Sequence, residues 1–383
     1  MILVITSWFP NNYEPTKCIF TKNILDAQAR YSKYEYKLIS PIPFFPKIKL
    51  PFIKGKFKNY SLLKFSEDNY NYKTYRPRFF KLPHPLTSNI EWYGYLRSVL
   101  RVINYENLNF ELVHSHGLYP DSYVAVKIAE KFKIPSVVHV HDSYLYELCE
   151  RYKSQIDFIM NLSHKIIAVS DFQKDILINK YPEHSDKIIT VYNGINTERF
   201  KIINYDVVGN VKLIFVGNLI KVKGVDILLR ALNILKTTFK ITLDIYGDGS
   251  NRIKYQDMAV QLGLSDFVNF KGIVSNDELT AVLNRYSFLV LPSRYETFGI
   301  VLIEAMACGI PVIATKVGAV PEVVSDERVG ILVEPNSPEA FAEGIKKAIK
   351  TNWNRGKIWK YAQRFSIENS STKLESIYDE ILA

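Results

Sequence analysis

The chain has 383 residues, 47% hydrophobic and 23% charged, so it can build two hydrophobic cores and has a globular rather than a disordered or fibrous composition. No uncharged apolar run reaches the roughly 18 residues of a membrane-spanning helix, and the N-terminal sequence MILVITSWFP lacks the basic stretch of a signal peptide. Three widely spaced cysteines exclude a disulfide framework and a cysteine metal site, and they predict free thiols in a reducing cytoplasm.

The net charge of +10 is concentrated in the first half of the chain. Residues 1–205 hold 28 Lys and Arg against 19 Asp and Glu, whereas the remainder holds 21 against 20. Ten basic residues and two acids lie between Lys47 and Lys81. This uneven distribution predicts that an anionic partner meets the first half only.

Strand and helix patterns alternate through the first half. The run Ile2–Thr6 is continuously apolar and β-branched, which is typical of a strand buried in a parallel sheet. The stretch from Pro41 to Pro85 breaks the pattern with repeated prolines and with aromatic residues among lysines. Further strands are expected at Tyr36–Ser40, Leu112–His116, Ser136–His141, Ile166–Ser170 and Ile188–Tyr192, and helices at Ile19–Tyr31, Asn89–Tyr105 and Asp121–Phe132.

The same alternation begins again after residues 206–210. Two successive arrays predict an α/β fold with two Rossmann-like, doubly wound domains that face each other across a cleft. We place these domains at residues 1–205 and 206–365, and we expect the C-terminal helix in residues 366–383 to cross back to the N-terminal domain. The expected strands of the second array are Val211–Gly217, Thr242–Tyr246, Phe267–Phe270, Ser287–Leu291, Val312–Ala314 and Gly330–Val333, with a helix at Val225–Leu235 and a last one at Ile367–Leu382.

One strand–turn–helix unit, Leu291–Ala314, carries two carboxylates eight positions apart. Glu296 falls in the turn before a helix that begins near Phe298, and Glu304 lies two turns further along. A helix N-terminus at the carboxyl end of a parallel strand is where α/β proteins bind phosphates and sugars. Helix capping and solvation would be the simpler explanation for Glu296 taken alone.

Two other strand-end loops of the same domain favour an anion site. The segment FVGNLIKVKG ends with Lys223 at the mouth of a helix, where a lysine supplies a point charge for phosphate. Gly247 follows another strand and permits either a tight turn or the close approach of a ligand. Each loop alone could be an ordinary surface turn, but three loops of this kind in one domain favour binding of an anion.

Histidines end two strands of the first half. His139 and His141 lie two residues apart and point to the same side of one strand, while His114 and His116 belong to another strand. Because no third ligand is close to the first pair in the sequence, we do not expect a zinc site and assign no metal. A neutral imidazole at a strand end suits a hydrogen bond to a sugar hydroxyl, and a buried histidine bonded locally is the alternative.

In their order along nearly the whole chain, these motifs resemble the family 4 glycosyltransferases, which are retaining, nucleotide-sugar-dependent enzymes of the GT-B fold. The segment PSRYETFGIVLIEAMACGIPVIAT resembles that family's two glutamates with seven residues between them, and VGNLIKVKGVDILL resembles its diphosphate-binding turn. The segments VYNGINTERF, AVSDFQKD and IPSVVHVHDS fit the remaining landmarks, and GLYPDSYVAVKIAEKFKIP is similar to members that build surface polysaccharides.

The resemblance implies a role for each matching residue. Glu296 would bind hydroxyls of the donor sugar, Glu304 would bind the ribose hydroxyls, and Lys223 would neutralise the leaving diphosphate. His141 would contact the donor sugar from the opposite domain. The catalytic residues implied are Glu296, His141 and Lys223, the donor-binding residues are Gly217, Asn218, Lys223, Gly247, Gly272, Ile273, Glu296, Thr297, Phe298, Gly299 and Glu304, and the residues on the acceptor side of the cleft are His116, Asn193 and Gly194.

Three positions depart from the family pattern. Asn218 stands where many members have arginine, Cys18 stands near a position that is often glycine, and Asp142 follows the motif histidine where glycine is common. The first departure leaves Lys223 as the chief cation for the diphosphate, and the second bears on backbone contact with the donor near Cys18. Because both acids, the lysine and His141 are retained, we expect an active enzyme.

The expected activity is transfer of a hexosyl group, with retention of configuration, from a UDP- or GDP-sugar to a saccharide or lipid-linked saccharide acceptor in cell-surface polysaccharide or glycolipid synthesis. The resemblance implies no cofactor beyond this co-substrate and no metal ion. Because the resemblance assigns Glu296 to the donor sugar and Glu304 to the ribose, neither carboxylate is left to act as a nucleophile. Front-face attack assisted by the departing phosphate is therefore the expected mechanism. The alternatives are a non-catalytic nucleotide-sugar-binding subunit of a glycosyltransferase complex and a nucleotide-sugar epimerase of the same fold.

The basic stretch Lys47–Lys81 has two explanations. Lysines interleaved with Phe44, Phe45, Phe52 and Phe57 suit an anionic membrane surface bearing a lipid-linked acceptor, which would make the protein peripheral at the inner face of the cell membrane. A solvated, irregular insertion explains the same residues. The spacing fits no nucleic-acid-binding motif, so nucleic acid is not an expected partner.

Overall fold

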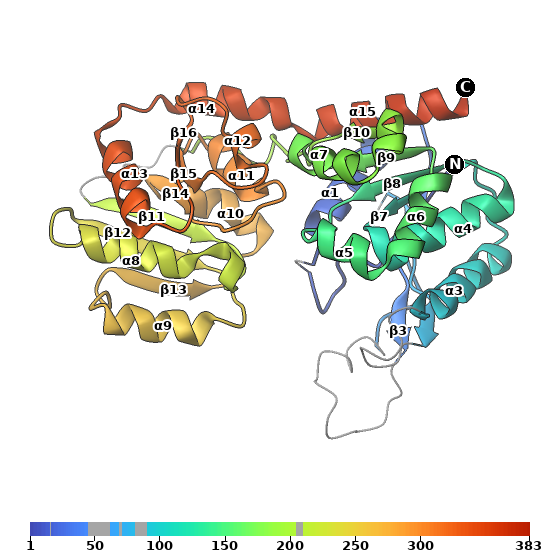
Figure 1. Ribbon diagram of the computed structural model, residues 1–383, viewed down its shortest axis with the longest axis horizontal. Helices are drawn as coiled ribbons and strands as arrows, with labels where there is room; N and C mark the ends of the chain where they lie inside the picture. The colour runs from blue at the N-terminus through green and yellow to red at the C-terminus, as the bar shows by residue number, and fades with distance from the viewer. Residues whose placement is uncertain (16, 45–61, 69–70, 81–89, 204–209) are drawn as a thin grey trace, which may run out of the picture. The chain divides into compact units, whose positions relative to one another are not determined.

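The structure is a computed structural model that describes residues 1–15, 17–44, 62–68, 71–80, 90–203 and 210–383. The chain forms two compact units: unit one comprises Met1–Tyr192 and Ile367–Ala383, and unit two comprises Asn193–Ser366. Each unit is built around its own largely parallel sheet with helices packed against it (Figure 1). The α/β fold with two Rossmann-like domains is therefore confirmed. Unit two begins at Asn193, before the predicted boundary at residue 205, and ends at Ser366, next to the predicted boundary at residue 365.

Unit one contains an eight-stranded sheet in the order β10-β9-β8-β7-β1-β2-β5-β4. Its pairs are parallel except for β4 with β5, and the strand order reverses between β1 and β7. A separate parallel pair, β3 with β6, lies beside it. The strands are β1 (Ile2–Ile5), β2 (Tyr36–Ile39), β3 (Ile42–Phe44), β4 (Ser66–Glu67), β5 (Lys73–Tyr75), β6 (Arg78–Phe80), β7 (Leu112–His116), β8 (Ser136–Val140), β9 (Lys165–Ala168) and β10 (Ile188–Thr190).

Alternate residues of β1 enter two hydrophobic cores, one on each face of the sheet. Ile2 and Val4 belong to the core under α1 and α15, whereas Leu3 and Ile5 belong to the core under α3 and α4. This period of two is the pattern of a strand that is buried on both faces. The helices of unit one are α1 (Ile19–Tyr31), α3 (Glu91–Tyr105), α4 (Tyr123–Phe132), α5 (Leu145–Arg151), α6 (Lys153–Leu162), α7 (Asp171–Lys180) and α15 (Ile367–Leu382), with a π-helical turn η1 (Leu118–Ser122) and a 3-10 turn η2 (Pro182–Lys187).

The C-terminal helix α15 is part of unit one, although the residues just before it belong to unit two. It packs against α1, and Ser370 Oγ donates to the Tyr192 carbonyl over 2.8 Å. Near its end, Tyr378 is fully buried and accepts a hydrogen bond of 2.7 Å from Gln28 on α1. The last helix is therefore a structural part of the N-terminal sheet domain rather than a loose tail.

Unit two contains a six-stranded parallel sheet in the order β13-β12-β11-β14-β15-β16, which reverses between β11 and β14. Helices α8 and α13 pack side by side, and α11 packs with α14 (Figure 1). The elements are β11 (Val211–Val216), η3 (Lys221–Lys223), α8 (Val225–Leu235), β12 (Ile241–Tyr246), α9 (Arg252–Gln261), β13 (Val268–Gly272), α10 (Asn276–Leu283), β14 (Phe288–Leu291), α11 (Ile300–Ala307), β15 (Val312–Thr315), α12 (Val320–Val323), β16 (Gly330–Val333), α13 (Pro338–Lys350), α14 (Arg355–Ala362) and η4 (Gln363–Phe365).

The sequence pattern reveals the long buried strands but not the short ones between Pro41 and Pro85. Strands β3 to β6 have only two or three residues each, which is too short for a period to be visible. Most of the basic residues between Lys47 and Lys81, together with Phe45, Phe52 and Phe57, lie outside the described residues. None of the helices in the described part of the chain is long and apolar enough to cross a membrane.

Candidate active site

The reversal of strand order in unit two marks the place where a doubly wound domain binds its ligand. Strands β12 and β13 lie on one side of β11, and β14 to β16 lie on the other. Ligands bind at the carboxyl ends of the strands at such a reversal. The loop after β11 carries Lys223, and the loop after β14 carries Glu296. The topology thus brings these two sequence positions, 73 residues apart, to one edge of the sheet.

Lys223 and Glu296 form an ion pair with 2.7 Å between Nζ and Oε2. Ser293 Oγ donates to the same carboxylate oxygen over 3.2 Å, and Glu296 as a whole is only 8% exposed. Both charges are therefore held in a partly dehydrated place where each compensates the other. A ligand with both a phosphate and a sugar hydroxyl could replace this mutual contact with one partner for each group.

Arg294 fixes the turn η3 that carries Lys223. Its backbone N–H donates to the Val222 carbonyl over 2.7 Å, and its Nη1 donates to the Lys221 carbonyl over 2.8 Å. The guanidinium also makes two hydrogen bonds, of 2.9 and 2.7 Å, to the Asp226 carboxylate in the first turn of α8. Although burial raises it, the pKa of Asp226 is held below its usual value by these bonds. No motif in the sequence gives Arg294 a role.

Two glycines allow the strand-end loops to pack directly on one another. Gly224 has φ +68°, and a Cβ atom there would lie 1.9 Å from the Pro292 carbonyl oxygen. Gly247 has φ +134°, and its Cβ would lie 1.9 Å from the Gly217 carbonyl oxygen. Only glycine fits at such approaches of backbone to backbone. In this structure Gly217 and Gly247 hold neighbouring loops together, and their contact with a donor stays a prediction.

The start of α11 presents backbone groups rather than side chains. Gly299 is the N-cap residue with φ +84°, and no side chain caps the first turn. The Phe298 ring is buried and meets Phe365 edge-on at 6.0 Å, so it belongs to the core of unit two. Thr297, which lies between Glu296 and Phe298 in the sequence, is half-buried. The unbonded N–H groups of a helix start are suited to an anion or to a sugar oxygen.

Glu304 lies on α11, two turns beyond Glu296, and is half-buried. Burial raises the pKa of Glu304 to about 7, and the positive charge of Arg199 opposes this rise. Among the residues that the structure describes, the Glu304 carboxylate has no hydrogen-bond partner, whereas Glu296 has two. Its acceptor capacity is therefore available to a ligand.

The other donor residues implied by the sequence lie around the same edge. Gly272 ends β13 with φ +78°, and its carbonyl accepts a 2.7 Å hydrogen bond from the Gly247 backbone. The end of β13 is therefore tied to the loop after β12. Ile273 follows it and is 67% exposed. Asn218 is exposed at the start of the loop that leads to Lys223. Asn193 and Gly194 lie at the beginning of unit two, and the next residue, Ile195, donates from its backbone N–H to the Phe365 carbonyl over 3.0 Å.

Four buried histidines stand side by side in unit one. The register of β7 and β8 places His116 opposite His139, and His114 and His141 each follow at a spacing of two, so that all four rings lie on one face. Neighbouring rings lie at centroid distances from 4.4 to 5.7 Å. We call this row the histidine ladder. The sequence treats the two pairs separately, because it does not reveal that β7 and β8 are neighbours.

Two hydrogen bonds involve the histidine ladder: one joins two of its rings, and the other joins a ring to a tyrosine. His116 Nδ1 lies 2.9 Å from His141 Nε2, and His114 Nδ1 lies 2.6 Å from the Tyr378 hydroxyl on α15. Burial lowers the pKa of His116 to about 3 and holds the pKa values of the other three rings well below the ordinary value. All four rings are therefore neutral at pH 7.

The histidine ladder brings together enough ring nitrogens to hold a metal. Ring nitrogens of His114, His116 and His139 lie within 4.8 Å of one another. A tetrahedral zinc site, with bonds of about 2.0–2.1 Å, holds its ligand atoms roughly 3.4 Å apart. The sequence argument that no third ligand is near is therefore wrong, and the expectation that no metal binds stays a prediction.

Two buried carboxylates lie at the strand reversal of unit one, and sequence reasoning gives neither of them a role. Asp121 accepts hydrogen bonds from the Ser7 hydroxyl at 3.0 Å and from the Tyr95 hydroxyl at 2.6 Å. Asp142 accepts from the Leu118 backbone at 3.0 Å. Burial raises the pKa of Asp121 to about 6 and that of Asp142 to about 7. An acid placed directly after a strand-end histidine, as in HVHD, was the available signal for Asp142.

Cys18 has a backbone conformation that glycine adopts more readily than other residues. It is the N-cap residue of α1 and has φ +47° and ψ +44°, in the left-handed region. This conformation costs an L-residue about 1–2 kcal/mol, whereas glycine adopts it freely. The backbone at Cys18 therefore has a conformation that glycine would adopt without this cost.

Comparison with known proteins gives a consistent result. The family model described as "Glycosyl transferases group 1" matches residues 198–365, and the model described as "Glycosyltransferase Family 4" matches residues 61–199. An uncharacterized glycosyltransferase of Methanocaldococcus jannaschii is 34% identical over 284 residues, which cover 72% of this chain and 77% of that protein. A D-inositol 3-phosphate glycosyltransferase of Streptomyces scabiei is 30% identical over 264 residues, covering 61% of this chain and 59% of that protein. The solved structure of Anabaena HepE in complex with UDP is similar with a TM-score of 0.75 at 21% identity, covering 99% of both chains.

Proposed function

Because this chain belongs to the group 1 and family 4 glycosyltransferases and has their GT-B fold, we propose that it transfers a hexosyl group from a nucleotide-diphosphate sugar to a saccharide or lipid-linked acceptor. The observation that carries this proposal is the Lys223–Glu296 pair at the strand reversal of unit two. A cation for a diphosphate and a carboxylate for sugar hydroxyls stand next to each other there. The donor is the ligand class that uses both.

The proposed donor is a UDP- or GDP-sugar. The complex of Anabaena HepE with UDP supports this class, although the bound UDP is a property of that protein. In this chain the ribose would be held by Glu304, whose carboxylate can accept two hydrogen bonds. The exposed loop at Gly272 and Ile273 would lie against the base. The sugar would reach Glu296 and the backbone at Gly299.

The proposed chemistry is transfer with retention of configuration. The acceptor oxygen forms a bond to the anomeric carbon on the face from which the phosphate oxygen leaves, and the acceptor proton passes to that departing phosphate. Lys223 stabilises the negative charge that grows on the diphosphate, and Glu296 lies near the positive charge that grows on the sugar. Neither step requires a covalent sugar–enzyme intermediate, which agrees with the ion pair that already occupies Glu296.

The proposed acceptor binds to unit one. The positive surplus is concentrated in residues 1–205, most of which belong to unit one, and a phosphorylated or lipid-linked saccharide is anionic. The Streptomyces scabiei relative is named for an inositol 3-phosphate acceptor, which is a phosphorylated polyol of this general class. Synthesis of a surface polysaccharide or a glycolipid at the inner face of the membrane is the proposed setting.

Thermal unfolding with nucleotide sugars tests the donor assignment. We expect one of UDP-glucose, UDP-galactose, UDP-N-acetylglucosamine or GDP-mannose to raise the midpoint by several degrees, because a ligand that binds only the folded state stabilises it. Lys223→Ala should remove at least half of this rise. Lys221→Ala is the matched control, since Lys221 is an exposed lysine in the same turn, and it should keep the rise. Equal loss in both variants would contradict a specific role for Lys223.

A further inference from the structure

We propose that Ser293 is a positioning residue whose hydroxyl holds Oε2 of Glu296, so that Oε1 is the oxygen that meets the donor sugar. The inference rests on the proposed function only in assigning the sugar to Glu296. The contacts that carry it all lie within unit two.

The two carboxylate oxygens of Glu296 have different surroundings. Oε2 accepts a hydrogen bond of 3.2 Å from Ser293 Oγ and lies 2.7 Å from Lys223 Nζ. Oε1 makes no hydrogen bond to the described residues, and it is not among the buried polar atoms that lack a partner, so solvent reaches it. The carboxylate therefore has one oxygen for the protein and one for a ligand.

The Ser293 hydroxyl has one direction open to it. Ser293 is fully buried, and an ionised carboxylate can only accept, so the hydroxyl proton must point to Glu296. The Ser293 carbonyl accepts a hydrogen bond from the hydroxyl of Thr315, which is fully buried as well. A buried donor that loses its acceptor carries a desolvation cost, and no water competes here for the proton. Thr315 thus holds the serine, and the serine holds the carboxylate.

The main chain of Glu296 is held by the loop after β15. Its carbonyl accepts a hydrogen bond of 3.1 Å from the Ala319 N–H. Gly318 has φ +53°, and a Cβ atom there would lie 1.9 Å from the same carbonyl oxygen. Because β14 and β15 pair with Leu291 opposite Ala314, the two loops leave the sheet side by side. The backbone of Glu296 is therefore fixed independently of its carboxylate, and loss of the serine hydroxyl should free the carboxylate alone.

Ser293 is needed most when a diphosphate is bound. A diphosphate that pairs with Lys223 draws the ammonium away from Oε2, and the Ser293 hydroxyl is then the remaining donor to that oxygen among the described residues. It keeps the carboxylate in place while Oε1 faces the sugar. Loss of the hydroxyl should therefore slow transfer without weakening the binding of the diphosphate, because Lys223 keeps its own turn.

Turnover measures this separation. The probe is the nucleotide sugar that stabilises the wild-type chain most, beside the affinity for its nucleoside diphosphate. We expect Ser293→Ala to lower kcat about tenfold, as for a hydrogen bond to a charged group, and to keep the diphosphate dissociation constant within about twofold. An unchanged kcat, or an equal loss of diphosphate affinity, would overturn the proposal.

Three further variants separate the hydrogen bonds from packing. Thr315→Val keeps the shape of the side chain but removes the hydroxyl that holds Ser293, so kcat should fall in the same direction by a smaller factor. Thr315→Ser keeps the hydroxyl and should stay near wild type. Ser287→Ala is the matched control, because Ser287 lies at the other end of β14 and its hydroxyl accepts from the Lys212 backbone over 3.2 Å. The same loss of kcat in Ser287→Ala as in Ser293→Ala would contradict the role of Ser293.

Crystal structures without ligand test the contact apart from the reaction. In Lys223→Ala the ammonium is gone, and we expect Ser293 alone to keep the Glu296 carboxylate in its wild-type position. In Lys223→Ala combined with Ser293→Ala, the carboxylate should turn away or occupy several positions while the main chain stays in place. The same carboxylate position in both variants would overturn the proposal. If the wild-type chain turns over no nucleotide sugar, the proposed function is wrong, and these two structures still decide whether Ser293 holds Glu296.

Discussion

Glu304 shows how burial alone sets the charge of a residue in the candidate site. Its pKa is raised to about 7 because the carboxylate is desolvated, and Arg199 only partly offsets this. A group whose folded pKa is raised contributes stability that is fully present below its unfolded pKa and is lost as the pH rises through about 7. Ionised Glu304 therefore costs folding stability, and a ribose that donates two hydrogen bonds to it would compensate that cost.

The affinity for UDP should accordingly rise with pH. At pH 6 about a tenth of Glu304 is ionised, and at pH 8 about nine tenths, so the UDP dissociation constant should fall up to about tenfold between these values. Isothermal titration calorimetry measures this directly. Glu304→Gln, which cannot ionise, should bind more weakly and should lose most of the pH dependence, apart from the ionisation of UDP itself. The same pH profile in both proteins would rule out Glu304 as the ribose ligand.

Single residues differ in how far the sequence alone reveals them. Glu296, Glu304 and Lys223 stand in motifs with fixed spacing, so the sequence alone is enough to propose roles for them, and these roles stay predictions. The sequence does not reveal the part that Arg294 plays. Its side chain bonds the Lys221 carbonyl and Asp226, and these groups come within reach only when the neighbouring loops pack together. The histidine ladder also depends on strand register, which sequence spacing does not give.

At the scale of elements, the candidate site of unit two is a set of loops held against one another by their backbones. The loop after β11 touches the loop after β12 at Gly247, and it touches the loop after β14 at Gly224. Arg294 then ties η3 to the first turn of α8. The position of the Lys223 ammonium is therefore set by a neighbouring element and not by its own turn alone.

Arg294→Lys should loosen that turn without removing a charge. A lysine cannot make the paired bonds to Asp226 and also bond the Lys221 carbonyl, because it lacks the planar fork of arginine. We expect the donor KM to rise about five- to tenfold with a smaller change in kcat. Arg328→Lys is the control, since Arg328 makes a similar paired contact with Asp326 at an exposed place in the same unit. An unchanged donor KM in Arg294→Lys would contradict the role of Arg294 in holding the turn η3.

The elements themselves are largely predictable from the sequence. Long apolar strands followed by amphipathic helices determine the two sheets, and the helix bounds Ile19–Tyr31, Val225–Leu235 and Ile367–Leu382 are those observed. The short strands β3 to β6 are not predictable, because they owe their pairing to neighbouring strands and not to a pattern of their own. The return of the last helix to the N-terminal domain is expected from the sequence, but its packing on α1 is not, because that packing depends on tertiary contacts such as the bond between Gln28 and Tyr378.

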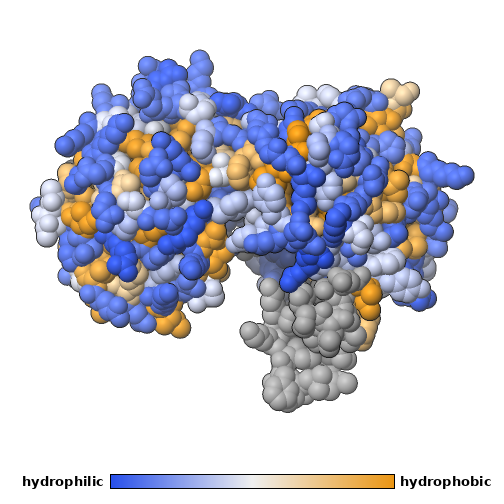
Figure 2. Space-filling view, in the orientation of Figure 1, coloured by the Kyte–Doolittle hydropathy of each residue, from blue (hydrophilic) through white to orange (hydrophobic). Residues whose placement is uncertain are grey.

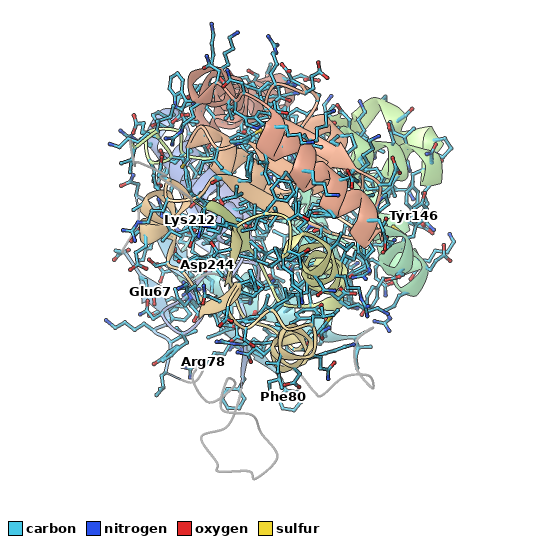
Figure 3. The ribbon with its side chains drawn as sticks, turned by 90° about the vertical axis from the view of Figure 1, so that its left-hand side faces the viewer. Glu67, Arg78, Phe80, Tyr146, Lys212 and Asp244 are labelled. Carbon is cyan, nitrogen blue, oxygen red and sulfur yellow. The ribbon has the colours of Figure 1, made fainter. Side chains whose placement is uncertain are left out.

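At the scale of the whole molecule, the membrane association expected from the sequence can be tested on the described surface around β6. Figure 2 shows a largely hydrophilic face with separate hydrophobic patches. On β6, Arg78 and Phe80 point outward on the same side while Phe79 is buried, and Phe80 is 64% exposed. Figure 3 shows both labelled side chains at the same end of unit one. Tyr93 at the start of α3 is 55% exposed. A cation beside exposed aromatic rings is the combination expected at an anionic bilayer surface.

Vesicle flotation tests whether this region binds membranes. We expect the protein to float with vesicles of phosphatidylglycerol and phosphatidylcholine at low salt and to be released by high salt, because the attraction is partly electrostatic. Phe80→Ser combined with Arg78→Ser should reduce the floating fraction at least twofold. Ile253→Ser is the control, since Ile253 is a 73% exposed hydrophobic residue of unit two. The absence of flotation at low salt would leave the solvated insertion as the explanation of the basic stretch.

In the proposed mechanism, unit two binds a sugar nucleotide through Lys223 and uses Glu296 on the sugar. The most direct measurement is turnover of the nucleotide sugar that stabilises the protein most, by release of the nucleoside diphosphate, in wild type and in Glu296→Gln, beside the affinity of each for that diphosphate. We predict that Glu296→Gln keeps the diphosphate affinity within about twofold and loses turnover about a hundredfold, as expected for a group that acts on charge developing in the transition state. Full turnover in Glu296→Gln with intact donor binding would contradict the account.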